Sequence, residues 1–285
     1  MTRLSLGRVP PLALVLVSIT SLQFGAALGV TLFDDVGPTG AAAVRLFFAA
    51  AVMLAVWRPR PADHPREALR VALAFGLVLG TMNWTIYLAL DRIPVGIAIT
   101  LEFLGPLGVA IAGSRTRLDV LWVLFAGAGV VLLADPFGSG GPDALGVALA
   151  LLAGALWAAY IVLAQHAGHH FRGATGLAIA MVVAAAVPLG PGIASGGTDL
   201  LAPEILGIGL IVALASSVIP YSFETEALRR MPRNVFGVLM SLEPAVAALA
   251  GFLVLSQDLG ARELVAIGLV VTASAGATRA PVPDP

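Results

Sequence analysis

The chain has 285 residues, of which 59% are hydrophobic and 12% are charged, and its formal net charge is −1. This hydrophobic content exceeds that of ordinary soluble domains, so the sequence predicts an integral membrane protein with the lipid bilayer as its surroundings. The balanced charge gives no reason to expect nucleic acid as a partner, and the absence of cysteine excludes disulfides, thiolate metal sites and cysteine nucleophiles.

Ten apolar segments follow one another along the chain. Each is long enough, or nearly long enough, to cross a hydrocarbon core of about 30 Å as a helix. Their expected limits are 11–33, 38–57, 68–90, 94–114, 119–134, 143–165, 173–195, 204–227, 232–256 and 262–278. The first segment is longer than the apolar run of a signal peptide, which has about 7–15 residues, so we interpret it as a span. The expected fold class is all-α, with ten transmembrane helices.

The basic residues indicate how these spans are oriented. All 16 are arginines, and most of them lie in loops on the side of the N-terminus. Only Arg92 and Arg262 lie in loops on the opposite side, and Arg45 lies inside a span. This excess predicts a cytoplasmic N-terminus and a cytoplasmic C-terminus. Each half of the chain then holds five spans, so the second half enters the membrane in the reverse sense.

Two matching stretches indicate an internal repeat. In each, an arginine stands two residues before a proline, and a second proline follows the first by 12 positions. The residues are Arg92, Pro94 and Pro106 in the first half and Arg230, Pro232 and Pro244 in the second. Each stretch also carries a glutamate inside an apolar run, Glu102 or Glu243. We therefore expect two inverted five-helix repeats, residues 1–134 and 143–279, followed by a short cytoplasmic tail, residues 280–285.

The two glutamates are the first candidates for function. A span that begins near Pro232 places Glu243 about 16 Å deep, close to the bilayer midplane. An ionised acid there costs at least about 2.5–3.5 kcal/mol, so Glu243 should face a polar interior with a partner. Inverted repeats with polar groups at interrupted helices are typical of secondary transporters, whose ligand site lies near the midplane. The alternative is that each glutamate is a structural hydrogen-bonding strut between helices.

Other polar and aromatic residues lie within the spans and are candidates for the lining of a cavity. Arg45 lies about 10 Å from the outer end of its span, where it can snorkel outward or pair with a glutamate. The remaining candidates are Asn83, Trp84, Tyr87, Trp157, Tyr160, Tyr221 and Glu224. For these seven residues, packing or interfacial anchoring is an equally good interpretation.

Several patterns do not indicate chemistry. Gly25 with Gly29 and Gly76 with Gly80 have GxxxG spacing, which indicates close helix packing. The histidines at 166, 169 and 170 lie in a polar loop without an acidic partner, so we expect no metal. The chain has no lysine and therefore no phosphate-binding Walker A motif, and no hydrolase motif is present. We expect no cofactor and no enzymatic activity.

Six stretches resemble the drug/metabolite transporter superfamily, of the ten-span EamA type, and most closely its threonine/homoserine exporter branch. They are residues 43–47 (AVRLF), 92–98 (RIPVGIA), 101–107 (LEFLGPL), 154–160 (GALWAAY), 219–224 (IPYSFE) and 236–245 (FGVLMSLEPA). Each motif is weak alone, but their order and spacing are specific. The resemblance implies export of small amino acids across the cytoplasmic membrane by alternating access, driven by protons. It leaves open a sugar, nucleotide or cationic drug as substrate, and it is compatible with a homodimer.

An amino acid zwitterion needs a cation for its carboxylate and an acceptor for its ammonium group, in a site dry enough for both interactions to count. Arg45 can supply the first, and Glu102 or Glu243 the second. We expect one of these glutamates to exchange the coupling proton. A different substrate class on the same fold would not depend on Arg45.

Overall fold

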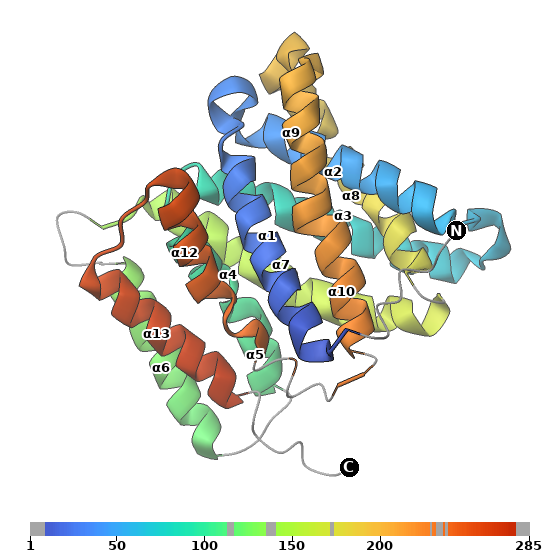
Figure 1. Cartoon of the computed structure of the whole chain (residues 1–285). Helices are drawn as coiled ribbons and strands as arrows, with labels where there is room; N and C mark the ends of the chain where they lie inside the picture. The colour runs from blue at the N-terminus through green and yellow to red at the C-terminus, as the bar shows by residue number, and fades with distance from the viewer. Residues whose placement is uncertain are drawn as a thin grey trace.

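The structure is a computed structural model that describes residues 9–112, 117–134, 141–171, 174–228, 230–231, 236 and 239–277. Over these ranges the chain is helical and contains no strand, which confirms the predicted all-α class (Figure 1). The predicted start of the ninth span at 232 and the predicted tail at 280–285 lie outside the described residues.

The first half of the chain forms three long helices followed by three shorter ones. These are α1 (Pro11–Val30), α2 (Phe33–Trp57), α3 (Arg66–Leu90), α4 (Val95–Glu102), α5 (Leu104–Ala112) and α6 (Arg117–Ala134), with the short turn η2 (Pro61–Asp63) before α3. Helix α2 is kinked at Gly37, whose φ of 69° is left-handed, directly before Pro38.

The second half begins with two long helices and continues with interrupted ones. Its elements are α7 (Ala144–His170), α8 (Thr175–Gly196), η3 (Gly197–Leu201), α9 (Pro203–Ala213), η4 (Leu214–Val218), α10 (Ile219–Leu228), α12 (Glu243–Leu255) and α13 (Ala261–Ala277). Element η4 is one turn of π-helix between α9 and α10. The predicted eighth segment is therefore helical but interrupted by η4, and the predicted fourth segment breaks at Phe103 between α4 and α5.

Six helical stretches of the described chain are long and apolar enough to cross a membrane. They are Pro11–Val30, Phe33–Trp57, Arg66–Leu90, Ala144–His170, Thr175–Leu201 and Pro203–Glu224. Large apolar side chains are exposed on the outside of the protein, for example Leu124, Leu253 and Val265. Charged and amide side chains such as Arg45, Asn83 and Glu243 are instead buried. This distribution is that of a multi-pass protein whose outer surface faces lipid.

Close helix packing holds the interior together. Helix α2 packs along α8, α3 along α7 and α8, α4 against α12, and α1 against α10 and α12, while α6 and α13 lie side by side at one edge (Figure 1). Gly76 and Gly80 allow α3 to approach α8, because a Cβ atom at either position would collide with the backbone oxygen of Ala180 or Ala184. The GxxxG spacing at these positions is thus a helix contact, as predicted.

Candidate functional site

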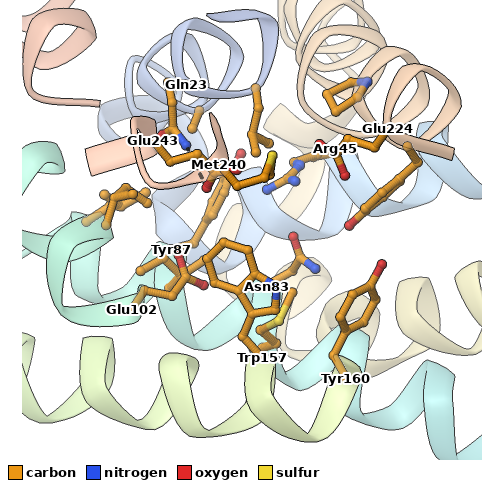
Figure 2. A pocket seen from close by; sticks show the side chains of 18 residues that line it. Gln23, Arg45, Asn83, Tyr87, Glu102, Trp157, Tyr160, Glu224, Met240 and Glu243 are labelled. Atoms are coloured by element: carbon orange, nitrogen blue, oxygen red, sulfur yellow. Dashed lines mark hydrogen bonds between the residues drawn. The ribbon is translucent and has the colours of Figure 1, made fainter. Parts of the chain in front are cut away.

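A pocket lies in the interior between α1, α2, α3, α4, α7, α10 and α12 (Figure 2). The cavity volume is about 100 Å³, which is small beside the roughly 300–1,000 Å³ of sites for drug-sized ligands. Its lining includes Arg45, Asn83, Tyr87, Glu102, Trp157, Tyr160, Tyr221, Glu224 and Glu243. The structure therefore brings together every candidate from the sequence except Trp84.

Trp84 points away from the pocket. Its indole Nε1 donates a hydrogen bond to Thr39 Oγ1 on α2, at 3.0 Å. The adjacent Asn83 lies in the pocket wall, where its Nδ2 donates to the carbonyl of Leu79 at 2.8 Å. Successive residues of a helix point about 100° apart, and here Asn83 is turned toward the pocket while Trp84 is turned toward α2.

Half of the 18 lining residues were not among the predicted cavity residues, and Gln23 and Met240 are two of them. Gln23 lies 2% exposed on α1, and Met240 lies just before α12. Gln23 is the only amide in the apolar run of the first span, which was a usable signal. Nothing in the local sequence distinguishes Met240 from an ordinary packing residue.

Breaks in two helices position the two glutamates. Glu102 is the last residue of α4, before the break at Phe103, and Glu243 is the first residue of α12, after a turn at Ser241 and Leu242. Pro106 and Pro244 each lack the N–H group that would continue the helical hydrogen bonding four residues upstream. The break beside Glu102 also packs against Gly154 of α7, where an added Cβ would lie 2.7 Å from the Glu102 carbonyl oxygen.

The π-helical turn η4 positions Arg45. The N–H of Ile219 bonds to the carbonyl of Leu214, five residues back, and Pro220 has no N–H to donate. This leaves carbonyl groups in η4 without a helical partner. Arg45 Nη2 donates to one of them, that of Ser216, at 3.1 Å, and Ser21 Oγ donates to that of Ala215 at 2.6 Å.

The guanidinium of Arg45 lies 5.3 Å from the centroid of the Tyr87 ring, which is a cation–π contact. Arg45 Nη2 also reaches Ser217 Oγ at 3.4 Å. Among the described residues, no carboxylate lies within ion-pair distance of Arg45, so the expected pairing with a glutamate is not present in this conformation.

Four buried polar atoms of the described chain have no hydrogen-bond partner, and all four belong to residues that line this pocket. They are Gln23 Oε1, Arg45 Nε, Tyr87 Oη and Glu243 Oε1. Buried polar groups in native proteins are nearly always paired, so a cluster of unpaired ones indicates a site that a ligand or water completes. Figure 2 shows Gln23 beside Glu243, with Gln23 Nε2 at 3.5 Å from Glu243 Oε2, and Arg45 across the pocket from them.

Glu224 lies at another part of the wall. Its Oε1 accepts a hydrogen bond of 2.6 Å from Ser18 Oγ on α1. The pocket thus contains three carboxyl groups and one guanidinium. No group of three or more possible metal ligands among histidine, aspartate and glutamate occurs in the part of the chain that the structure describes.

Comparisons with known proteins agree with this architecture. Residues 144–279 match the EamA-like transporter family. The threonine/homoserine exporter RhtA of Escherichia coli K12 is 39% identical over 96% of this chain and 94% of its own length. The chain belongs to the EamA-type branch of the drug/metabolite transporter superfamily that contains these exporters. The RhtA protein of Salmonella typhimurium LT2 is also 39% identical, over 94% of this chain and 91% of its own.

These findings confirm the family resemblance seen in the sequence motifs. The chain is a membrane transporter of the EamA type and not an enzyme, since the family and the relatives are transporters. A protein of known crystal structure shares the fold, with a TM-score of 0.59 and 19% identity over 93% of this chain and 97% of that one.

Proposed function

We propose that this protein exports small amino acids such as threonine and homoserine across the cytoplasmic membrane, by alternating access and in exchange for protons. The relatives that match over nearly the whole chain are named as exporters of these two amino acids. Both substrates are zwitterions with a short polar side chain, so the pocket must offer a cation, an anion and little free volume.

The observation that carries this proposal is the set of unpaired polar atoms in the pocket. Arg45 Nε and Tyr87 Oη are donors, and they suit a substrate carboxylate. Gln23 Oε1 and Glu243 Oε1, across the pocket from Arg45, are acceptors, and they suit an ammonium group (Figure 2). A zwitterion bound between them would satisfy all four atoms, which the protein alone leaves unsatisfied.

Proton coupling follows from competition at one carboxylate. Glu243 is 1% exposed, and it has no arginine or histidine within ion-pair distance in the described structure. A carboxylate in such surroundings needs either a proton or a ligand cation to balance its charge. Binding of the substrate ammonium group would displace the proton, and release of the substrate outside would allow another proton to bind. Glu102, on the facing broken helix, is the second candidate for this role.

We also propose that the two halves are inverted five-helix repeats with both termini in the cytoplasm. Residues 1–134 and 143–279 would form the repeats, with residues 280–285 as a tail. The packing supports this, because helices at equivalent places in the two halves contact each other: α2 with α8, α4 with α12, and α6 with α13. A two-fold axis between the halves would bring the equivalent helices that lie near it into such contacts. The excess of arginine in the loops on the N-terminal side supports the orientation.

A cationic compound is the second candidate for the substrate. The pocket holds three carboxyl groups against one guanidinium, and Arg45 already donates to Ser216 and Ser217. An Arg45→Ala variant that keeps full activity would favour a cationic drug or metabolite over an amino acid zwitterion.

The test is uptake of labelled threonine and homoserine into everted membrane vesicles, with and without an imposed proton gradient. We expect gradient-driven uptake in the wild type and its loss in Glu243→Gln. The matched control is Glu67→Gln, because Glu67 is exposed in the first turn of α3 and lies outside the pocket. Unchanged uptake in a well-inserted double variant, Glu102→Gln with Glu243→Gln, would contradict the proposal.

A further inference from the structure

A second pocket adjoins the first. It lies between α3, α7, α8 and α10, and its lining includes Phe75, Gly168, Phe171 and Leu177. Tyr160, Tyr221 and Glu224 line both pockets, so these three side chains form the wall between them. The two hollows are thus separated only by side chains, without intervening backbone layers.

The second pocket opens at one end of the bundle. It is bordered by the last turns of α7 and the first turn of α8, and Gly168 at its edge is exposed. The beginnings of α3 and α8 and the ends of α7 and α10 lie on the side of the N-terminus in the proposed orientation. The backbone oxygen of Val9, which accepts from Arg230 Nη2 at 2.8 Å, marks the same side.

Exposure increases from the central pocket toward this opening. Gln23, Tyr87 and Glu243 at the deep end are 1–2% exposed. Tyr160, Tyr221 and Glu224 in the shared wall are partly exposed. The central pocket is therefore closed at its deep end and more open toward the second pocket.

Glu224 is the only charged side chain in the lining of the second pocket. Ser18 holds one of its carboxylate oxygens, Oε1, and no other described group donates to this carboxylate. The rings of Phe75 and Tyr160 lie 5.1 Å apart in the same wall and present aromatic surface to the hollow. A carboxylate and aromatic faces attract an organic ammonium group and do not attract an anion.

We propose that the second pocket is the cytoplasmic vestibule of the transporter, and that Glu224 at its inner end is the first group to bind the ammonium of an incoming amino acid. This inference rests on the proposed function, since it names the route to the same site. From Glu224 the ammonium group passes between Tyr160 and Tyr221 to Gln23 and Glu243, while the substrate carboxylate reaches Arg45 and Tyr87.

The absence of cysteine from the chain makes a direct test feasible. A Gly168→Cys variant places a single thiol at the edge of the vestibule, where an added Cβ meets no atom within 4 Å. The control is Gly268→Cys on α13, which has the same free space and lines neither pocket. Ala174→Cys, also in the lining of the second pocket, serves as a second reporter if Gly168→Cys inserts poorly.

In everted vesicles, membrane-impermeant thiosulfonate reagents should modify Gly168→Cys, and this modification should abolish threonine uptake. Gly268→Cys, which lies exposed at the middle of α13 and faces lipid in the proposed arrangement, should not react with these reagents and should keep its uptake. The ratio of reaction rates for a cationic and an anionic reagent of similar size should fall when Glu224→Gln is added to Gly168→Cys. Comparing the ratio between the two backgrounds removes the intrinsic difference in reactivity between the reagents.

Three results would overturn the inference. If charged reagents fail to modify both vestibule cysteines while an uncharged maleimide succeeds, the hollow holds lipid. If modification leaves uptake unchanged, substrate takes another route. If the rate ratio is the same with Glu224→Gln, this carboxylate does not bind the incoming cation. A failure of the proposed function can be told apart from a failure of this inference. In that case the wild type takes up no amino acid, although the labelling of Gly168→Cys and the ratio of reaction rates are as expected.

Discussion

The hydroxyl of Tyr87 has no partner among the described residues, although the side chain is 1% exposed and its ring lies under the guanidinium of Arg45. Removal of an unpaired buried hydroxyl costs the fold nothing and can stabilise it. A hydrogen bond from this hydroxyl to a substrate carboxylate is instead worth about 1.5–3 kcal/mol, or roughly a 10- to 100-fold change in affinity.

We therefore expect Tyr87→Phe to raise the KM for threonine by about tenfold or more without lowering the melting temperature. The control is Trp84→Phe on the same helix, which breaks the hydrogen bond to Thr39 outside the pocket and should lower stability while leaving KM unchanged. Vesicle uptake kinetics and thermal unfolding in detergent measure the two effects. A lower melting temperature with unchanged KM for Tyr87→Phe would mean that the hydroxyl is structural.

At the scale of residues, the sequence predicts which charged side chains are buried better than it predicts which side chains of a helix point into the pocket. Glu102, Glu243 and Arg45 could be assigned to the interior because an ionised group facing lipid is too costly. The choice between Asn83 and Trp84 depends on the rotation of α3 about its axis, which packing against α7 and α8 sets. Residue identity alone carries no signal for that rotation.

At the scale of elements, η4 and Pro220 together expose the carbonyl groups that hold Arg45 and Ser21. A Pro220→Ala change restores an N–H group and favours regular α-helix by about 3 kcal/mol. We expect the π-helical turn to regularise, which rotates α10 and turns Tyr221 and Glu224 away from the pocket. Uptake should be lost while thermal stability is equal or higher.

Pro191→Ala is the matched control for this change. Pro191 also lies inside a helix, α8, but it is exposed and lines neither pocket. It should leave uptake unaffected. Full uptake in Pro220→Ala would contradict a role for the π-helical turn.

The break beside Glu102 depends on Gly154. An alanine there would place its Cβ 2.7 Å from a backbone oxygen, so α4 and α7 would have to move apart. Such overpacking typically costs about 1–3 kcal/mol. We expect Gly154→Ala to lower both the melting temperature and uptake, whereas Gly108→Ala on α5, which meets no atom within 4 Å, should change neither. If the two variants have the same melting temperature in detergent, the contact between Gly154 and the backbone of Glu102 is not tight.

Only some of the helix interruptions could be predicted from the sequence. The long apolar runs predict helices, and Pro106 and Pro244 indicate breaks next to the glutamates. The π-helical turn left no comparable signal, because Pro220 is tolerated in ordinary membrane helices when a neighbour supplies the missing donor. Here Arg45 is that neighbour, and it lies 175 positions earlier in the chain. A contact at that separation is fixed by the tertiary fold.

Across the whole molecule, one end of the bundle is held closed while the vestibule opens at the other. At the closed end, Gln257 Oε1 accepts from the backbone N–H of Val95, at 3.0 Å, and joins the loop after α12 to the first turn of α4. Gly96 of α4 meets Ala248 of α12 at the same end, where an added Cβ would lie 2.9 Å from its Cα. The proposed alternating access requires these contacts to separate when the vestibule closes.

Gln257→Leu removes the acceptor and leaves the N–H of Val95 without its side-chain partner. This loss destabilises the conformation seen here. It does not destabilise a conformation in which α4 and α12 are apart, because the hydrogen bond is absent there. Such a change shifts the population toward the outward-open state. We expect slower cytoplasmic labelling of Gly168→Cys in the Gln257→Leu background, because the vestibule is closed for more of the time. Asp258→Asn, at an exposed position beside Gln257 in the same loop, is the matched control and should leave the labelling rate unchanged. If Gln257→Leu lowers the melting temperature and labelling proceeds at the wild-type rate, the hydrogen bond stabilises the fold without biasing the transport cycle.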